Sequence, residues 1–554
     1  MTVHALPRES AADAGPMSRS RTWMPVLLAA LWLGATLGWR ALALPDEGRY
    51  AGVAWEMLRS GHWLVPSLDG LPYFHKPPLF YWLTAGAFAL FDVSGWTARV
   101  APWLGAVVAV AAIHSLALRV KGAVFARNVV LVLATQPFFY AGAQYANLDM
   151  LVAGMIAASV VCFAIAAVRA DTGEPFRAVA VAAWVAMALA VLAKGLIGIV
   201  LPIAIVGLWL ILLRRWRIIV ALCAWPGLLA FFLLAAPWFI AVGDRVPGFL
   251  DYFFVEQHFR RYLGSSFNNR HPFWFLPVAL ALLCLPWSAW LPLAGTRGVR
   301  SLLRRGQALA QPASMHALML VWAGTVLVFF SIPSSKLVGY VLPCLPPLAW
   351  LIALAASRSS GVRARAWWRA SAIIAAIVCV SSIGAIAIWY PYSSQTVAHA
   401  LDANRKAGEP IYFVGDYYFD LPLLARLHSP VIVVDEWADP AIRARDNWRK
   451  ELADAARFAP ARGREVLVPY AQARVRLCAG PTAWIVSPAR SPRGFADAIP
   501  IVANSGHLVL RRFDPASPDA ARALACPAGS ATPAAARRQG PGGATTATAS
   551  APGS

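Results

Sequence analysis

Charged side chains are scarce in this chain of 554 residues: they make up 14% of it, whereas soluble domains devote about a quarter to them. Acidic residues are fewer than basic ones, with 27 Asp and Glu against 49 Lys and Arg, so the net charge is +22. The basic residues stand in short clusters between apolar runs, and the mean hydropathy is +0.57. This pattern excludes an ordinary soluble globule, argues against a nucleic-acid-binding surface and indicates a membrane protein.

Cysteine is also scarce, and no spacing among the seven residues matches a metal site. Five of them lie within or beside apolar runs, where a thiol behaves as a small hydrophobe. The other two, Cys478 and Cys526, lie in the polar C-terminal part. They form a candidate disulfide, because the topology below places this part in an oxidising compartment.

Long apolar runs are abundant, and they predict about eleven transmembrane helices, thirteen at most. The runs cover residues 22–44, 98–118, 128–140, 150–168, 178–193, 196–213, 218–242, 273–295, 316–331, 337–357 and 370–390. The polar residues 1–21 show no cleavage site after a short apolar core, so we expect the first run to remain as an anchor behind a cytoplasmic tail.

Every second loop between these runs is basic, and by the positive-inside rule such loops face the cytoplasm. The basic loops contain Arg119, Lys121 and Arg127; Arg169 and Arg177; Arg214, Arg215 and Arg217; Arg297, Arg300, Arg304 and Arg305; and Arg358, Arg363, Arg365 and Arg369. The first outer loop is then 45–97, and everything beyond 391 also lies outside.

The C-terminal part is less hydropathic, and short β-rich runs predict a small α/β domain over 391–526 outside the membrane domain of 22–390. The runs are Ile411 to Val414, Val431 to Val434, Val466 to Val468, Trp484 to Val486 and Leu508 to Leu510. Residues 527–554 are mainly Ala, Gly, Pro and Thr, a composition that predicts disorder.

The first outer loop is the segment with the most functional groups. A helical pattern starts at Asp46 and places Asp46, Arg49 and Tyr50 on neighbouring turns, so that an acid, a cation and a phenol face one cavity. The apolar positions of this helix predict that it lies along the membrane surface. They are Ala51, Ala54, Trp55 and Leu58. The simpler interpretation is that Asp46 only caps the helix.

The motifs of this loop resemble those of bacterial aminoarabinose transferases, which are relatives of protein O-mannosyltransferases. The matching residues are Asp46, Glu47, Arg49 and Tyr50; Glu56, Met57 and Leu58; Tyr73, Phe74, Lys76 and Pro77; and Tyr81 and Trp82. The resemblance is strongest over about 22–345 and implies a GT-C glycosyltransferase with about eleven to thirteen membrane helices and a periplasmic α/β domain.

The resemblance also implies a substrate class and a location. Members of this family take a sugar from undecaprenyl phosphate at the periplasmic face of the bacterial inner membrane, and the namesake enzymes transfer aminoarabinose to a phosphate of lipid A. We therefore expect a multi-pass inner-membrane enzyme with its N-terminus in the cytoplasm, which transfers the sugar with inversion.

Several basic residues stand where the topology predicts few: Lys76 in the first outer loop, Lys194 between two apolar runs, Arg260 and Arg261 in an outer loop, and Lys336 in a short one. Cations near a membrane need a partner, and a lipid phosphate is one. The alternative for each residue alone is that its side chain reaches the lipid headgroups.

Transfer from a polyprenyl phosphate requires cations aimed at the leaving phosphate. Lys76, Arg49, Lys194, Arg260 and Lys336 are the candidates, and the resemblance adds Tyr50, Tyr73 and Tyr340 as hydrogen-bond donors to that phosphate. Asp46 and Glu47 are the candidate catalytic acids. With a hydroxyl acceptor Asp46 must act as a base, and with a phosphate acceptor it orients groups or balances charge.

Asp149 closes a short outer loop, where it is expected to pair with a lysine such as Lys194 or simply to cap the next helix. His75 occupies a position at which many family members carry an acid. His75 and His258 are the candidate ligands of a divalent metal such as zinc, although two ligands are a weak signal and an ordinary polar role is the simpler one. No cofactor is otherwise required.

Three other interpretations compete with this assignment. A flippase or transporter would also have many helices, but we find no internal repeat and the charges collect in outer loops. The same class of enzyme with a polyprenyl-phosphate hexose as donor and a protein, glycan or other lipid as acceptor is the nearest rival. In the third interpretation the outer C-terminal domain is the functional part and the membrane region is only its anchor. An anchor needs one span, whereas about eleven are predicted.

Overall fold

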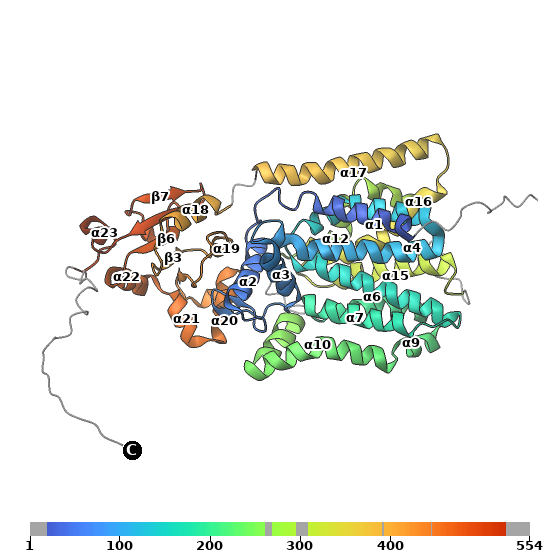
Figure 1. Cartoon of the computed structure of the whole chain (residues 1–554), viewed down its shortest axis with the longest axis horizontal. Coiled ribbons are helices and arrows are strands. Elements are labelled where there is room, and N and C mark those ends of the chain that lie inside the picture. The colour runs from blue at the N-terminus through green and yellow to red at the C-terminus, as the bar shows by residue number, and fades with distance from the viewer. Residues whose placement is uncertain (1–18, 261–268, 295–307, 390–392, 445, 528–554) are drawn as a thin grey trace, which may run out of the picture.

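The computed structural model describes residues 19–260, 269–294, 308–389, 393–444 and 446–527. The side chains of Arg19, Ser20, Ala294, Arg443 and Ala444 and of residues 258–260 are also outside what it describes. Figure 1 shows an elongated molecule with a long helical bundle at one end, a smaller α/β domain at the other, and α2 and α3 between them.

The bundle is made of helices from most of the first 389 residues, joined by short connections. Its elements are α1 (Arg19–Gly34), α4 (Val100–Thr135), α5 (Pro137–Ala143), α6 (Leu148–Asp171), α7 (Arg177–Lys194), α8 (Ile197–Leu212), α9 (Trp216–Leu222), α10 (Trp225–Arg245), η2 (Asp251–Arg260), α12 (Phe275–Leu283), η3 (Trp287–Trp290), α13 (Leu291–Ala294), α15 (Pro312–Ser331), η4 (Val338–Cys344), α16 (Leu345–Arg358) and α17 (Val362–Trp389).

Small residues let the central helices of the bundle approach closely, as is typical of helix packing in membranes. A Cβ atom on Gly154 of α6 would stand 2.1 Å from the carbonyl oxygen of Gly105 in α4, so only glycine fits there. Helix α4 is broken at Gly122, whose φ of 79° is non-helical. The break separates the two runs predicted at 98–118 and 128–140.

Seven helices within the described ranges are long and apolar enough to cross a membrane, or eight if the bent pair α12 and η3 to α13 forms one span. Helices α3 (Leu79–Phe91) and α8 are apolar but shorter. The chain is thus a multi-pass membrane protein, while the count of eleven to thirteen spans stays a prediction. The predicted tail, most of the loop with Arg297 to Arg305, and the predicted disordered end lie largely outside the described residues.

The first outer loop is largely ordered. Helix α2 (Asp46–Ser60) ends at Gly61, whose φ of 69° is the left-handed conformation common after a helix. The short strands β1 (Ser67–Leu68) and β2 (Leu71–Pro72) then form an antiparallel hairpin whose turn is Asp69-Gly70. Both turn residues have positive φ, as such hairpins require.

Helix α2 is buried on more than the predicted apolar face, while its place along the membrane surface stays a prediction. Tyr50 and Met57 are buried as well as the predicted Ala51 and Ala54. The reason is the C-terminal domain, which covers α2: a Cβ atom on Gly48 would stand 2.9 Å from the backbone nitrogen of Asp420.

The C-terminal part contains a six-stranded mixed sheet in the order β5-β4-β3-β6-β8-β7. Strands β3 (Ile411–Val414), β4 (Ile432–Val434), β5 (Leu467–Val468) and β6 (Ala483–Ser487) pair in parallel, and β8 (Val509–Phe513) and β7 (Ile501–Asn504) add antiparallel strands. Each predicted β-rich run overlaps a strand, whereas β7 was not predicted because it is mostly exposed.

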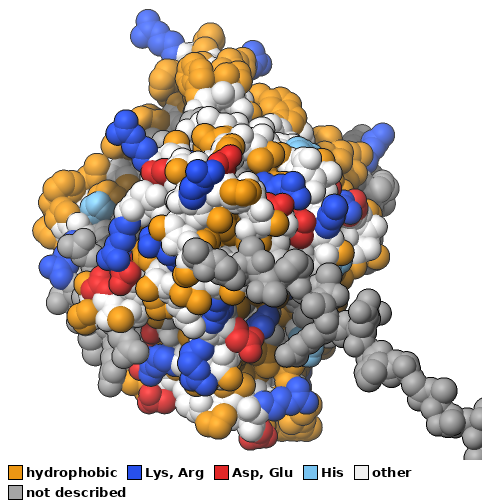
Figure 2. All heavy atoms as spheres, turned by 90° about the vertical axis from the view of Figure 1, so that its left-hand side faces the viewer, with side chains coloured by type: hydrophobic (Ala, Val, Ile, Leu, Met, Phe, Trp, Pro, Cys, Tyr) orange, Lys and Arg blue, Asp and Glu red, His pale blue; other side chains and the backbone are white. Residues whose placement is uncertain are grey.

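The helices around this sheet are α18 (Gln395–Asn404), α19 (Leu421–Leu424), η5 (Pro440–Ala444), α20 (Trp448–Arg457), α21 (Pro460–Val466), α22 (Tyr470–Ala479), η6 (Pro492–Gly494) and α23 (Pro518–Ala523). Cys478 at the end of α22 and Cys526 after α23 form the predicted disulfide. Figure 2 shows acidic and basic side chains interspersed over this end of the molecule, as on a surface in water.

Candidate active site

A cavity of about 730 Å³ lies where the first outer loop, the ends of several bundle helices and the C-terminal domain meet. Nine of the residues predicted for the site line it: Asp46, Arg49, Tyr50, Tyr73, His75, Lys76, Asp149, Lys194 and Tyr340. They come from segments far apart in the sequence, so the fold brings together most of the predicted site.

Arg49 is the centre of a charged cluster on one wall of the cavity. Its two terminal nitrogens form ion pairs with Asp46, one turn earlier in α2, and with Glu451 of α20. The guanidinium also lies 5.0 Å from the ring centre of Tyr50. The predicted grouping of Asp46, Arg49 and Tyr50 is confirmed, and the Asp46 side chain remains 37% exposed to the cavity.

Tyr73 and His75 form a second part of this wall. Their rings stack with centroids 4.7 Å apart, and the hydroxyl of Tyr252 lies 2.9 Å from Nε2 of His75. The Tyr73 hydroxyl donates to Glu451, 3.3 Å away. Burial raises the pKa of Tyr73 and the carboxylate of Glu451 raises it further, so the phenol stays protonated and can donate a hydrogen bond.

Asp149 and Lys194 face this cluster from the bundle. They form the predicted ion pair, and Nζ of Lys194 lies 4.7 Å from the ring centre of Tyr340. A Cβ atom on Gly339 would stand 2.4 Å from an oxygen of Asp149, so glycine is needed for the carboxylate to reach this position. An acid, a lysine and a tyrosine thus sit together.

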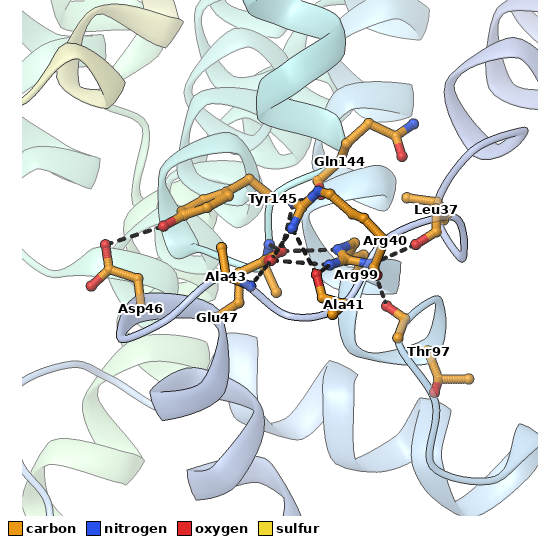
Figure 3. A network of polar contacts seen from close by, with 12 residues as sticks. Leu37, Arg40, Ala41, Ala43, Asp46, Glu47, Thr97, Arg99, Gln144 and Tyr145 are labelled. Carbon is orange, nitrogen blue, oxygen red and sulfur yellow. Dashed lines mark hydrogen bonds and ion pairs between the residues drawn. The ribbon is translucent and has the colours of Figure 1, made fainter. Parts of the chain in front are cut away.

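Glu47 was expected at the reaction centre. Its side chain is instead fully buried and does not line the cavity. Figure 3 shows its carboxylate held between Arg40 and Arg99, and the backbone nitrogens of Ala43 and Ala146 also donate to it. Burial alone would raise the pKa of Glu47, but the two arginines lower it from 4.5 to about 2. Glu47 is a structural anion that fixes the start of α2.

Lys336 also differs from its expected role, because it is not among the residues that line the cavity. It is 2% exposed, and its Nζ donates to the carbonyl oxygens of His271 and Pro333, which pin the loop after α15. The neighbouring Leu337 lines the cavity instead. The predicted roles of Arg260 and His258 concern side chains that lie outside the described residues.

The predicted metal site at His75 gains no third ligand from the structure. The part of the chain that the structure describes contains no group of three His, Cys, Asp or Glu side chains that could hold a metal ion. His75 instead contacts Tyr73 and Tyr252. The described geometry therefore gives no support to a zinc ion at this position.

The sequence interpretation missed the wall that the C-terminal domain contributes. Its residues are Asp416, Tyr417, Tyr418, Phe419, Asp446, Asn447, Trp448, Glu451 and His507. Burial raises the pKa of Glu451 and Arg49 opposes this, with the net shift upward. No local motif marks these residues, although Glu451 lies in a short amphipathic helix that starts after Asn447, whose side chain caps the helix.

Comparisons with known proteins agree with this architecture. Residues 26–253 match the family model described as dolichyl-phosphate-mannose-protein mannosyltransferase. The fold is similar to the crystal structure of ArnT from Cupriavidus metallidurans bound to undecaprenyl phosphate, with a TM-score of 0.74 and 24% identity over 90% of this chain and 98% of that one.

Two curated relatives share the name undecaprenyl phosphate-α-4-amino-4-deoxy-L-arabinose arabinosyl transferase. The protein from Erwinia tasmaniensis is 30% identical over 399 residues, which are 71% of this chain and 69% of the relative. The protein from Pseudomonas aeruginosa strain UCBPP-PA14 is 32% identical over 342 residues, 61% of this chain and 60% of the relative.

The helical bundle, the charged cavity at its end and the mannosyltransferase match define a membrane glycosyltransferase of the GT-C type. Within that class, the chain belongs to the undecaprenyl phosphate-α-4-amino-4-deoxy-L-arabinose arabinosyl transferase family.

Proposed function

We propose that this enzyme transfers 4-amino-4-deoxy-L-arabinose from undecaprenyl phosphate to a phosphate of lipid A at the periplasmic face of the bacterial inner membrane, with inversion at the anomeric carbon. The names of the relatives supply the donor and the sugar. The acceptor follows from the resemblance of the first outer loop to lipid A-modifying enzymes.

The observation that carries the proposal is the presence of both signs of charge in one cavity. Among its described lining residues, Arg49, Lys76 and Lys194 are basic, and the acidic ones are Asp46, Asp149, Asp416, Asp446 and Glu451. An aminoarabinose donor carries a negative phosphodiester and a positive amine, so it complements both sets. A hexose donor would offer only the negative charge, which suits this mixture less well.

The same residues suggest how the reaction proceeds. A phosphate oxygen of the acceptor attacks the anomeric carbon, the bond from that carbon to the undecaprenyl phosphate oxygen breaks, and the leaving phosphate takes the electron pair. Lys76 and Lys194 are suited to stabilise that growing negative charge, and Arg49, held between two carboxylates, is suited to bind the phosphate. Because the acceptor is already an anion, Asp46 orients Arg49 and balances its charge, and no strong base is required.

The proposed topology has eleven to thirteen membrane helices, with the N-terminus in the cytoplasm and the domain of 391–526 in the periplasm. The alternation of basic loops supports this orientation. The disulfide between Cys478 and Cys526 is also consistent with an oxidising compartment.

The test is mass spectrometry of lipid A from a strain that lacks the gene and from the same strain complemented with the wild-type or the Asp46→Asn protein. We expect an added mass of one aminopentose with the wild type alone. If lipid A is unchanged while both proteins reach the membrane, the proposed acceptor is wrong. Assays of the purified enzyme with aminoarabinose and hexose donors then separate the proposal from its nearest rival.

A further inference from the structure

The C-terminal domain reaches the proposed donor site through one side chain, Glu451. Its Oε1 atom forms an ion pair with Arg49, and its Oε2 atom accepts a hydrogen bond from Tyr73 at 3.3 Å. The side chain is about 10% exposed. A single carboxylate from α20 therefore bridges two residues of the first outer loop that are expected to bind phosphate.

Arg49 is held on several sides by this arrangement. Asp46 occupies one terminal nitrogen and Glu451 the other, and the guanidinium lies 5.0 Å from the ring centre of Tyr50 and 5.9 Å from that of Phe419. Two carboxylates on one arginine leave no net positive charge in the cluster. A phosphate that approaches Arg49 therefore meets a cation that is fixed in place and whose positive charge is already offset by Asp46 and Glu451.

The position of Glu451 is itself well defined by its helix. The side chain of Asn447 caps α20, and Phe458, just past its end, packs edge to face against Phe74 and Tyr252, with ring centroids 4.9 and 5.3 Å away. Arg457 at the end of α20 forms an ion pair with Glu256 at 3.5 Å. These contacts fix the carboxylate against the outer loops at the cavity wall.

We infer that Glu451 is a positioning residue of the donor site, which holds Arg49 and Tyr73 toward the cavity and offsets the charge of Arg49 so that the phosphate product is released. The inference rests on the proposed use of undecaprenyl phosphate. It makes the C-terminal domain a part of the reaction site, since α20 supplies a group that acts on the leaving phosphate through Arg49 and Tyr73.

The test compares the full-length wild type with Glu451→Gln and Glu451→Asp in lipid nanodiscs. Glu465→Gln is the matched control, because Glu465 also pairs with an arginine of the C-terminal domain but is 62% exposed and lies outside the cavity. The measurements are the Kd of undecaprenyl phosphate and the kcat and KM of the donor. A purely structural role would lower the amount of folded enzyme and leave Kd and KM unchanged.

For Glu451→Gln we expect a Kd for undecaprenyl phosphate about tenfold lower than that of the wild type, and a kcat about tenfold lower, because a repelling charge is lost and the product leaves slowly. Glu451→Asp keeps the charge but is too short to reach both partners, so its Kd stays at the wild-type value while its kcat falls. Glu465→Gln matches the wild type in every measurement.

The inference is overturned if Glu451→Gln binds undecaprenyl phosphate as the control does or more weakly. If Glu451→Gln fails to fold, Glu451→Asp decides: a kcat equal to that of the control rejects the positioning role. A wild-type protein that does not bind undecaprenyl phosphate contradicts the proposed function itself, so the two failures are distinguishable.

Discussion

Two clusters of carboxylates and arginines lie side by side at the start of α2, and they have opposite surroundings. Glu47 is sealed between Arg40 and Arg99 with no exposed surface, whereas Asp46 faces the cavity and shares Arg49 with Glu451. Asp46 and Glu47, neighbours in one helix turn, thus have different surroundings and different expected roles. The closed cluster holds the backbone at the start of α2, and the open cluster lines the cavity.

The largest expected effect is on turnover, from the open cluster. Asp46→Asn and Lys76→Ala should each reduce the transfer rate by about 10³-fold or more, because the first removes the carboxylate that orients Arg49 and the second removes a cation at the leaving phosphate. The thermal midpoint of the purified protein should stay within about 2 °C of the wild type, since a partly exposed charge at a cavity wall contributes little stability. Donor turnover and thermal unfolding are measured on the same samples. Wild-type turnover by either variant would remove that residue from the site.

The closed cluster should respond in the opposite way. Glu47→Gln leaves two buried arginines without their anion, and breaking such a buried pair costs about 3–5 kcal/mol. We therefore expect a clear fall in the thermal midpoint and a lower folded yield, with an unchanged KM for the donor in the fraction that folds. A stable Glu47→Gln protein with an altered KM would mean that Glu47 acts on the substrate.

The closed cluster also predicts a dependence of stability on pH. The pKa of Glu47 is about 2 in the folded protein and 4.5 without its partners, so the unfolded chain takes up a proton first as the pH falls. The stabilisation, about 3 kcal/mol, is complete above pH 4.5 and is lost as the pH falls from 4.5 to 2. Thermal midpoints of the wild type should drop in this range more steeply than those of Glu47→Gln. Parallel curves would contradict the assignment.

The smallest effect should come from the hydroxyl of Tyr340, which the resemblance makes a donor to the phosphate, because the contact in the structure is between the ring of Tyr340 and Lys194. Tyr340→Phe keeps the ring beside Nζ of Lys194 and should change the transfer rate less than about threefold, whereas Tyr340→Leu removes the ring and about 1 kcal/mol of cation–π attraction. The two rates are compared in the donor assay. A large loss in Tyr340→Phe would show that the hydroxyl, rather than the ring, serves the phosphate.

The sequence was most informative where chemistry and local periodicity coincide. Helical spacing predicted that Asp46, Arg49 and Tyr50 face one cavity, and β-rich runs located five strands, since local spacing controls both. The partner of Arg49 could not be predicted in this way, because Glu451 is 402 residues away and belongs to a different domain. Glu47 was assigned to the wrong surroundings, although Arg40 and Arg99, near the ends of two apolar runs, are a signal that a buried anion is required.

The distance in sequence between Arg49 and Glu451 also has a consequence for biosynthesis. At about 5–20 residues per second, the ribosome adds Glu451 some 20–80 s after Arg49. Throughout that interval the growing chain lacks the wall of the cavity that the C-terminal domain supplies. The cavity is complete only when nearly all of the chain has been translated and the C-terminal domain has folded against α2.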